Sequence, residues 1–483
     1  MNSEIDPTEP VGAGFADEVH IASSRATWQE ITARLKAQAP SEACTFVLTR
    51  PSRGVLRATV LLREILWPLP GEVLATPHRL EISADYISRV LDSAIDAGPM
   101  VGVCLVHTHP KSDLGEGIAQ FSRRDDWYEQ RLFPTLVLGR PNSVSASVVL
   151  ASTGDVDARI WWEGERGVCA QAAHAIRAVG PELTIIETPS SHWADHSDPA
   201  IMDRSTRLWG KEGRKKLQNL RVGVLGGGGT GSLSVFALAT MGVGKLLAWD
   251  KDVAAAQNRH RTAGITKKHV GKPKVRALKA HAESVATAEP FTMEVYEDWG
   301  TTAEGLKRLK DCDVIFCCVD KFAPRVPLND MAYAHLIPTL DMASWMHVDH
   351  NKQIDSLMTH AHVWSPGIPC AWCRETLSSR VLTQEAQGRQ QDIENRAPYG
   401  LSLKETDGVE PSVLPLNMLG VSLALMQFMQ VALKITARTP NDLKFFLPEW
   451  ELDESDRPAR EACDCLTSIG MGDTLSIRPV SME

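Results

Sequence analysis

The sequence predicts an α/β protein of two domains, an N-terminal α+β unit followed by a doubly wound parallel sheet. Three observations support this prediction. The chain has 483 residues, which is too long for one ordinary hydrophobic core. Short strand-like runs dominate its first third, whereas strands and helices alternate after about residue 220. Between these parts, the stretch from Glu187 to Ser205 is rich in Pro, Ser, Asp and His, which is typical of a linker.

The composition is that of an ordinary globular protein, with 43% hydrophobic and 23% charged residues. The net charge of -9 argues against an obligate nucleic-acid partner. Glu4, Asp6 and Glu9 stand where a signal peptide would need a basic start and an apolar core. Polar residues interrupt the long apolar stretch 413–435, which favours a buried or dimer-interface helix over a membrane span. We therefore expect a cytoplasmic protein with no membrane partner, in which the 10 cysteines stay reduced.

The N-terminal domain is expected to span residues 1–165. Short apolar runs predict its strands, and amphipathic stretches predict its helices. We expect helices at 24–38 and 83–97, and strands at 43–48, 53–66, 99–106, 134–138 and 143–151. Residues 166–180 look helical, and the linker is placed over 166–199.

The sharpest chemical signal is His107-Thr-His109-Pro, followed by Ser122-Arg-Arg-Asp125. Histidines two residues apart on a strand point to the same side, so both can bind one metal ion. An aspartate from a following helix can supply a third ligand and leave the fourth zinc position open for water. Glu42, one strand away, is the candidate general base, and Ser122 could donate to a developing oxyanion.

This ordered pattern resembles the JAMM (JAB/MPN) zinc isopeptidase family, whose signature is Glu, then His-x-His-Pro, then Ser-x-x-Asp. The resemblance covers the first third of the chain and implies cleavage after the C-terminal tail of ubiquitin-like proteins. It implies roles by position: zinc ligands His107, His109 and Asp125, oxyanion donor Ser122 and acid/base Glu42. The insertion at 111–120 is longer than usual and could form a loop over the site. Glu64 is a rival to Glu42, and a surface His-x-His pair beside an unrelated helix cap is the non-catalytic alternative.

Strands and helices alternate in the second domain, which is expected over residues 200–483. Buried strands are expected at Arg221–Leu225, Lys245–Trp249 and Asp313–Val319, with a helix after the first that runs to about Met241.

A glycine loop lies between the first of these strands and its helix. Gly226, Gly228 and Gly231 have the G-x-G-x-x-G spacing, which lets phosphates approach backbone N–H groups at a helix N-terminus. Asp250 ends the next strand, where an acid can hold ribose hydroxyls. From this loop alone, an NAD-dependent oxidoreductase is a fair interpretation.

Charged residues after these strands favour adenylation over hydride transfer. An adenylation site needs cations for the triphosphate and an acid that holds magnesium. Arg261, Lys274 and Asp320 provide that set, for which a hydride-transfer site has no need.

These motifs resemble the adenylyltransferase fold shared by molybdenum-cofactor and thiamine-pathway enzymes and by ubiquitin-activating enzymes. The resemblance covers about 200–483 and implies ATP and Mg²⁺ as cofactors. It implies that Asp250 or Asp252 binds ribose, Asn258 and Arg261 contact phosphate, Lys274 contacts the α- and β-phosphates, and Asp320 binds magnesium. The alternative is an unrelated dinucleotide-binding domain with scattered charges.

The segment Asp203-Arg204-Ser-Thr-Arg207 resembles the N-terminal helix of the same family. There an arginine reaches the ATP of the partner subunit. The resemblance therefore implies a homodimer in which Arg207 acts as the finger.

Two cysteine pairs could hold a structural zinc, Cys370-x-x-Cys373 and Cys463-x-Cys465, although free thiols in turns are the alternative. Relatives that form a thioester commonly carry a cysteine before the late apolar helix. The corresponding stretch 404–410 has none. Cys317 and Cys318 lie in a predicted core strand. The chemistry could therefore stop at the acyl-adenylate, or a partner such as a conjugating enzyme could supply the nucleophile.

Four further histidines flank a predicted strand pair: His347, His350, His360 and His362. We expect a solvated or core role for them rather than a metal site.

The leading hypothesis is a bifunctional enzyme for a ubiquitin-like protein, in a bacterial conjugation pathway. One head would trim the tail and the other would adenylate its terminal glycine. The alternatives are activation of a sulfur-carrier protein for biosynthesis and a non-catalytic scaffold. Because the two motifs lie roughly two hundred residues apart, on either side of the Pro/Ser/Asp-rich linker, we expect little communication between the heads through the fold.

Overall fold

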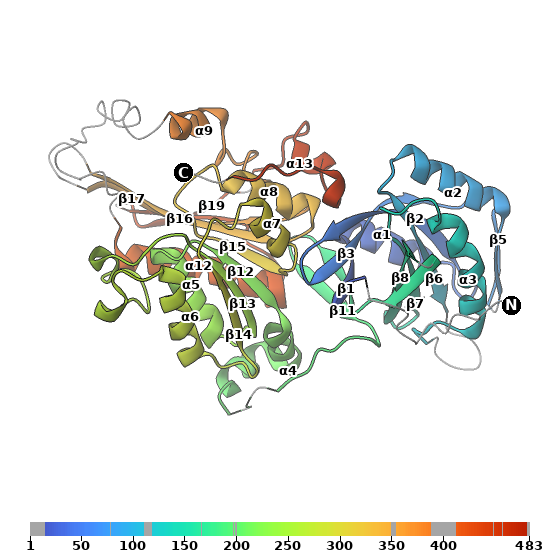
Figure 1. The fold of residues 1–483 in the computed structure, drawn as a ribbon, viewed down its shortest axis with the longest axis horizontal. Helices are drawn as coiled ribbons and strands as arrows, with labels where there is room; N and C mark the ends of the chain where they lie inside the picture. The colour runs from blue at the N-terminus through green and yellow to red at the C-terminus, as the bar shows by residue number, and fades with distance from the viewer. Residues whose placement is uncertain are drawn as a thin grey trace.

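The computed structural model describes residues 15–480, apart from 78, 111–117, 166, 197, 199, 349–353, 388–411, 448 and 456. Two lobes lie side by side (Figure 1), each built on its own large sheet. The mixed α/β class predicted from the sequence is confirmed.

The N-terminal lobe is a nine-stranded sheet in the order β11-β10-β1-β3-β2-β6-β7-β8-β9. Its strands are β1 (Glu18–Ser24), β2 (Cys44–Arg53), β3 (Arg57–Leu66), β6 (Gly102–His109), β7 (Ser145–Ala151), β8 (Val156–Gly164), β9 (Gly167–Ala172), β10 (Ala175–Val179) and β11 (Leu183–Glu187). A separate ribbon consists of β4 (Val73–Thr76) and β5 (Arg79–Ile82).

Three helices cover the two faces of this sheet. α1 (Arg25–Lys36) packs on one face, whereas α2 (Ala84–Asp96) and α3 (Arg123–Val137) pack on the other. Each helix starts at a serine whose hydroxyl accepts a backbone N–H, which satisfies a donor of the first turn. The helices expected at 24–38 and 83–97 are confirmed.

Two local predictions in this lobe are wrong. Residues 134–138 end helix α3 rather than forming a strand, because Leu132, Phe133, Leu136 and Val137 make one buried helical stripe. A helix was expected over 166–180, but residues 167–180 are not helical: β9 forms a hairpin with β8, and β10 pairs in parallel with β1. The pairing partner of β10 lies about 155 residues earlier in the chain, so no local pattern reveals it. Most of the expected linker therefore belongs to the N-terminal sheet.

The C-terminal lobe is an eight-stranded sheet in the order β14-β13-β12-β15-β16-β17-β18-β19. Its strands are β12 (Arg221–Leu225), β13 (Lys245–Trp249), β14 (Thr292–Tyr296), β15 (Val314–Cys317), β16 (Thr339–Val348), β17 (Ile354–Trp364), β18 (Asp442–Leu447) and β19 (Glu451–Glu454). The first five in this spatial order are parallel, and the last three extend the sheet in antiparallel fashion.

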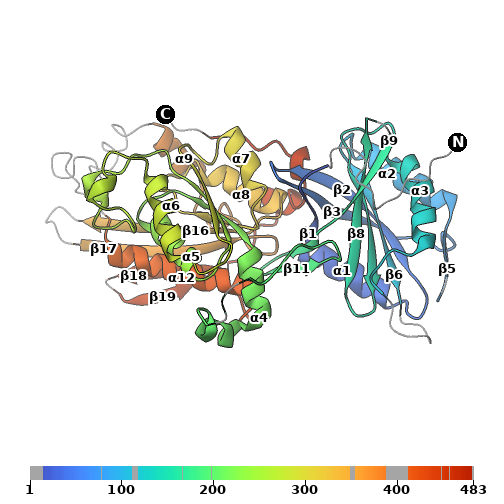
Figure 2. The same cartoon turned by 60° about the horizontal axis from the view of Figure 1, so that its bottom comes forward.

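Helices lie on both faces of this sheet (Figure 2). They are α4 (Asp203–Asn219), α5 (Gly229–Thr240), α6 (Lys274–Val285), α7 (Ala303–Leu309), α8 (Arg325–Ala334), α9 (Ser379–Ala386), α12 (Leu414–Leu433) and α13 (Asp464–Thr467). α5, α6 and α12 share one core, and α7 and α8 pack on the opposite face.

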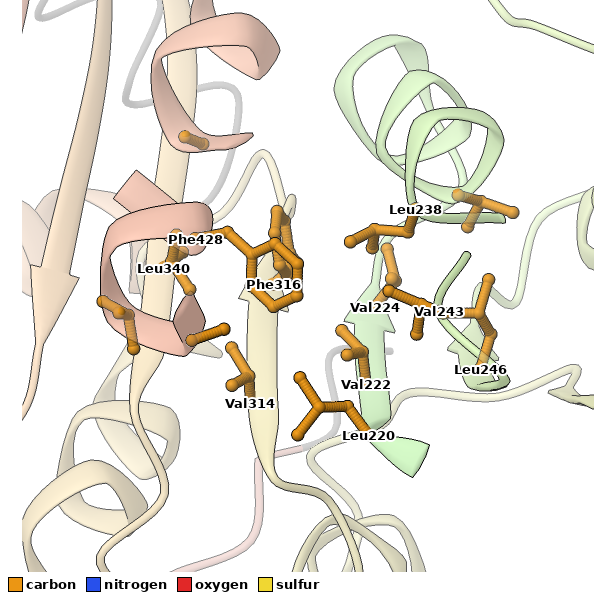
Figure 3. Packing of buried hydrophobic residues seen from close by; sticks show 14 of the residues in the cluster. Leu220, Val222, Val224, Leu238, Val243, Leu246, Val314, Phe316, Leu340 and Phe428 are labelled. Carbon is orange, nitrogen blue, oxygen red and sulfur yellow. The ribbon is translucent and has the colours of Figure 1, made fainter. Parts of the chain in front are cut away.

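Helix α12 is long and apolar enough to span a membrane by length and composition. In this structure it packs against β16 and β17, and 56% of its most apolar window is buried. Its Phe428 meets Phe316 of β15, with ring centroids 5.5 Å apart (Figure 3). The buried-helix interpretation of 413–435 therefore holds for this face, while Met418 and Met426 on the outer face remain 50% and 55% exposed.

The two lobes share one hydrophobic core. Leu61 of β3 and Val179 of β10 belong to the same buried cluster as Leu220 and Val222, at the start of the second lobe. The two lobes are therefore packed directly against each other and are not separated by the linker alone. Burial of apolar surface across the boundary favours unfolding as one unit.

Buried ion pairs reinforce this boundary. The Arg57 guanidinium donates to Asp313 Oδ1 at 2.7 Å, and the backbone N–H of Arg221 donates to Asp313 Oδ2 at 2.8 Å. Asp311 accepts the backbone N–H of Arg57 at 2.9 Å. Loss of one partner from such a buried pair typically costs about 3–5 kcal/mol, because the remaining charge has no compensation.

Two buried histidines at the same boundary should make stability depend on pH. Burial holds the pKa of His20 well below its usual value, and the nearby Arg57 and Arg177 lower it further. Burial likewise lowers the pKa of His335, whose Nδ1 lies 2.8 Å from Ser52 Oγ. Below about pH 6.5 each of these histidines binds a proton in the unfolded chain but not in the folded chain. Each histidine therefore lowers the free energy of unfolding by up to about 1.4 kcal/mol for every pH unit of acidification.

We therefore expect the free energy of unfolding to fall as the pH is lowered from 7 to 5. Urea titrations at several pH values should show a smaller slope for His20→Gln and for His335→Gln than for the parent protein. An equal slope in all three proteins would contradict this assignment.

Candidate active sites and metal centres

The N-terminal site lies where β6 ends and α3 begins. His107 and His109 project from the same side of β6, and Asp125 lies in the first turn of α3. His107 Nε2 is 3.3 Å from Asp125 Oδ1, and His109 Nε2 is 3.3 Å from Asp125 Oδ2. The structure thus brings the three expected ligands together, with spacings close to the roughly 3.4 Å between ligands of a tetrahedral zinc ion.

The donors at this site fit a divalent cation. His107 is 3% exposed, and among the described residues neither of its ring nitrogens makes a hydrogen bond. The buried His107 Nε2 faces the Asp125 carboxylate at 3.3 Å without hydrogen-bond geometry, and a metal ion between them would bind both groups. Nδ1 of His109 lies 3.2 Å from the Ile118 carbonyl, an outer contact that leaves Nε2 facing Asp125.

Glu42 lies beside these ligands. β2 runs antiparallel to β6 with Cys44 opposite His107, so Glu42 comes level with the end of β6. Burial raises the pKa of Glu42, while the neighbouring His107 and His109 oppose that rise. A carboxylate with a raised pKa close to the ligands suits proton transfer.

The rival Glu64 is part of an ion-pair cluster elsewhere. It pairs with Arg50 at 3.3 Å and with Arg63 at 3.0 Å. The geometry therefore favours Glu42 as the acid/base.

Ser122 is the N-cap of α3 in a reciprocal capping box. Its Oγ accepts the Asp125 N–H at 3.2 Å, and Asp125 Oδ2 accepts the Ser122 N–H at 2.6 Å. This box fixes the Asp125 carboxylate, and a serine hydroxyl that accepts one bond can still donate another. The loop expected over the site falls largely at 111–117, outside the described residues.

The second site lies at the carboxyl ends of β12 and β15. Strands β13 and β14 lie on one side of β12, and the next strand in the chain, β15, lies on its other side. Open α/β sheets bind ligands at such a change in strand order. Gly226 has a φ of 93°, and a Cβ there would lie 2.6 Å from the Cys318 carbonyl oxygen. A Cβ on Gly228 would meet no described atom within 4 Å, so this part of the loop faces open space. Gly228 caps α5, whose N-terminus is suited to phosphate.

The two aspartates after β13 have different surroundings. Asp250 accepts the backbone N–H groups of Gly227 at 2.6 Å and Asp252 at 2.7 Å, so it braces the glycine loop. The Asp252 side chain is 54% exposed and pairs with Lys274 Nζ at 2.7 Å. Of the two predicted ribose ligands, the geometry favours Asp252.

Asn258 and Arg261 lie in the next turn. Asn258 Oδ1 accepts the Ala255 N–H at 2.7 Å, so this side chain shapes the turn. The Arg261 backbone approaches Gly229. Asn417 of α12 also reaches Gly229, a contact that we did not predict. The sequence feature that could have indicated this contact is a polar residue inside an otherwise apolar helix.

Asp320 is exposed in the loop after β15, and Arg325 holds this loop. Its guanidinium donates to the Val319 carbonyl at 2.8 Å and to the Lys321 carbonyl at 2.7 Å. Arg325 is in turn bound by Asp341 at 2.8 Å. Neither Arg325 nor Asp341 was predicted as part of the site.

The four cysteines of the expected structural zinc site converge. Cys370 Sγ lies 3.6 Å from Cys373 Sγ and 3.5 Å from Cys463 Sγ, and all four sulfur atoms lie within 4.8 Å of one another. Hydrogen bonding from Cys465 lowers the pKa of Cys370 to about 5. Such a set of sulfur donors fits a structural zinc ion.

Cys317 and Cys318 are buried core residues, as expected. Burial raises the pKa of Cys318 to about 12, so its thiol is a poor nucleophile at neutral pH. The stretch 404–410, in which no cysteine occurs, lies outside the described residues.

Loss of metal should affect the two expected zinc sites differently. His107→Asn with His109→Asn should remove about one zinc ion per chain and leave the unfolding temperature nearly unchanged. Cys373→Ser should lower that temperature strongly, because structural zinc binding contributes to the folding free energy. Metal analysis and thermal unfolding of the same samples test both statements, and unchanged zinc in the double variant would contradict the N-terminal site.

Comparison with known proteins matches each lobe separately. A family model described as prokaryotic homologs of the JAB domain matches residues 24–163, and the ThiF family model matches residues 202–398.

Individual relatives match over shorter stretches. The tRNA threonylcarbamoyladenosine dehydratase of Bacillus subtilis is 40% identical over 19% of this chain and 38% of its own length. The sulfur carrier protein ThiS adenylyltransferase of the same organism is 31% identical over 27% of this chain and 39% of its own length. Ubiquitin-like modifier-activating enzyme 5 of Mus musculus is 28% identical over 24% of this chain and 31% of its own length. The chain thus spans at most 39% of the length of these three relatives.

Among solved structures, E. coli MccB is 15% identical, with a TM-score of 0.43 over 56% of this chain and 74% of that chain. From the two family matches and the geometry above, the chain carries a prokaryotic JAB domain over residues 24–163 and a domain of the ThiF adenylyltransferase family over residues 202–398.

Proposed function

We propose that this protein is a bifunctional enzyme of a bacterial ubiquitin-like conjugation pathway. Its N-terminal lobe cleaves the tail of a ubiquitin-like protein, and its C-terminal lobe activates the terminal glycine as an acyl-adenylate. The observation that carries this proposal is the joint presence of a His-His-Asp cluster beside Glu42, able to hold a metal ion, and a glycine turn that adjoins Cys318, two residues before Asp320.

In the cleavage reaction, His107, His109 and Asp125 would hold a zinc ion. When bound, zinc supplies Lewis acidity to water and to the scissile carbonyl. Glu42 takes the proton of the attacking water and passes it to the leaving amine. The Ser122 hydroxyl donates a hydrogen bond to the oxyanion as the carbonyl becomes tetrahedral.

In the adenylation reaction, the backbone N–H groups between Gly226 and Gly231 receive the phosphates of ATP. Lys274 and Arg261 neutralise charge on the triphosphate, and Asp252 holds the ribose. Asp320 would hold magnesium, which supplies charge neutralisation for the leaving pyrophosphate. A glycine carboxylate oxygen forms a bond to the α-phosphorus while the bridging bond to the β-phosphate breaks.

The names of the relatives support a small carrier protein as substrate. One is an adenylyltransferase of the sulfur carrier ThiS, and another is an activating enzyme for a ubiquitin-like modifier. The first of these names favours a second candidate function, in which the acyl-adenylate is converted to a thiocarboxylate. Both functions use the same first step.

A capture experiment with ATP tests the adenylation step directly. The full-length protein with ATP and magnesium should capture a small protein whose intact mass increases by one adenylate. The Asp320→Asn variant should bind the same small protein without that increase. Captured protein of unchanged mass with the active enzyme would contradict adenylation.

We further propose that the enzyme acts as a homodimer in which Arg207 reaches the ATP of the partner subunit. The Arg207 side chain is 77% exposed and pairs with Asp203 one turn away. Its neighbour Leu208 is 65% exposed, and α4 packs against α12, where Met418 is 50% exposed. Exposed apolar side chains on two helices that pack against each other suit a subunit interface.

Arg207→Ala should slow adenylation at least about tenfold, because a cation on the transition-state charge is lost. Mixing Arg207→Ala with Asp320→Asn should restore roughly a quarter of the activity, since half of the dimers then carry one complete site. Pyrophosphate exchange measures this recovery. No recovery in a mixture that light scattering shows to contain dimers would contradict a shared site.

A further inference from the structure

We propose that the buried ion pair of Glu129 with Arg159 positions the metal ligands of the N-terminal site. Glu129 accepts the ring N–H of His107. Arg159 fixes the turn of α3 that carries Asp125. The inference rests on the proposed cleavage function, because it assigns two outer residues to the same site. Neither residue belongs to the sequence pattern that indicated the site.

The register of three neighbouring strands places Arg159 on the same face of the sheet as His107. β6 pairs in parallel with β7, with His107 opposite Val149. β7 pairs in antiparallel fashion with β8, with Ser147 opposite Arg159. Ser147 and Val149 are two residues apart, so their side chains share a face. Arg159 therefore lies beneath α3, the helix that packs on this face.

The Arg159 guanidinium holds the first two turns of α3. Its Nε–H donates to Glu129 Oε2 at 2.7 Å, and its Nη1 donates to Asp126 Oδ1 at 2.8 Å. The guanidinium also lies 3.9 Å from the ring centroid of Phe121, just before the helix cap. These contacts lie on both sides of Asp125 in the chain. Arg159 therefore fixes the direction in which this turn presents the Asp125 carboxylate.

Glu129 follows Asp125 by one helical turn, so both carboxylates lie on the inner face of α3. Glu129 is almost fully buried, and its Oε2 also accepts the Ser147 hydroxyl at 2.9 Å. Its Oε1 is buried too and makes no hydrogen bond with any residue that the structure describes. Burial raises the pKa of Glu129, and the nearby Arg159 and His107 oppose that rise. One carboxylate oxygen of Glu129 is thus open to a donor, and its charge acts on His107.

His107 can provide that donor. Its Nε2 faces Asp125 at 3.3 Å, so a metal ion bound at Nε2 leaves the ring proton on Nδ1. Nδ1 is buried, and within the described part of the chain it has no hydrogen-bond partner. A carboxylate on the far nitrogen is a usual outer contact of a metal-binding histidine, and one buried water can bridge such groups. Glu129 is therefore the acceptor for His107, directly or through one water.

Chelator competition measures zinc affinity at the N-terminal site, in full-length protein that keeps its zinc at the four cysteines. Glu129→Gln should weaken zinc binding there by about 10–100-fold, the usual effect of losing an outer contact. Glutamine has the same shape and can still accept from Arg159, so the unfolding temperature of the protein without zinc at this site should change little.

Arg159→Lys is the second variant, and it decides the question if Glu129→Gln does not fold. It should also weaken zinc binding, because an ammonium group cannot hold Glu129 and Asp126 with one planar fork. Cobalt(II) bound at the N-terminal site adds a spectroscopic readout. Its visible absorption should differ between the parent protein and Glu129→Gln, because the orientation of the His107 ring changes.

Tyr128→Phe is the matched control. Tyr128 is the neighbouring residue of α3, and its hydroxyl is also buried without a partner among the described residues. This variant should keep the zinc affinity and the cobalt spectrum of the parent protein.

Three results would overturn the proposal. They are parental zinc affinity in well-folded Glu129→Gln, parental zinc affinity in Arg159→Lys, and weakened zinc binding in Tyr128→Phe alone. A parent protein that binds no zinc at the N-terminal site would instead remove the proposed cleavage function together with this inference. The readouts of affinity and absorption do not depend on cleavage activity.

Discussion

Replacing Glu42 by glutamine should lower the rate of tail cleavage by roughly 10²–10⁴-fold, the usual contribution of a general base. The substitution removes the proton acceptor beside His107 and His109 but retains all three ligands, so zinc content should not change. Cleavage of a ubiquitin-like protein with a short C-terminal extension, followed by mass spectrometry, measures the effect. ATP–pyrophosphate exchange by the same sample should stay at the level of the parent protein.

Glu64→Gln is the matched control for this experiment. Glu64 lies in an ion pair with Arg50, so its loss should leave cleavage nearly unchanged. If Glu64→Gln stops cleavage and Glu42→Gln does not, the assignment of the base is wrong although the metal site stands.

Asp320→Asn should lower adenylation by at least about a hundredfold, because the variant loses the charge that holds magnesium at the leaving pyrophosphate. Asp320 is exposed, and its loop is held by Arg325 through backbone carbonyls. The substitution should therefore cost little folding free energy. Pyrophosphate exchange reports the loss, and tail cleavage by the same protein should be retained.

The shared core of the two lobes makes a folding control necessary in both experiments. A variant that unfolds at a lower temperature could lose both activities together through Leu61, Val179 and their neighbours. If the two sites act separately, each substitution should silence one reaction in a protein whose unfolding temperature is unchanged. Loss of both reactions in well-folded Asp320→Asn would contradict that view.

The predictions that agree with the structure were based on residues that lie close together in the sequence. His107 and His109 share a face because strand residues alternate, and Ser122 with Asp125 forms a capping box because their spacing is three residues. The glycine loop after β12 and the early part of the parallel sheet follow from the same kind of local pattern.

Features that depend on distant pairing were not predictable in this way. Strand β10 is recognised as a strand only when it pairs with β1, and the apolar face of β3 continues into the second lobe. Asp341 meets His362 only through the register of β16 with β17, and Arg325 meets Asp341 only through the fold of α8 against the sheet. The histidines were visible in the sequence, but their carboxylate partner was not.

We propose that one chain trims a carrier-protein tail and then activates the carboxylate that the cut exposes. The most direct test measures the intact mass of one ubiquitin-like or sulfur-carrier protein that is extended by two residues beyond its terminal glycine. Incubation with the zinc-loaded protein should remove the extension, and addition of ATP and magnesium should then add one adenylate to the trimmed form only. An adenylate on the uncut protein, or trimming that is never followed by adenylation of the same molecule, would contradict the account.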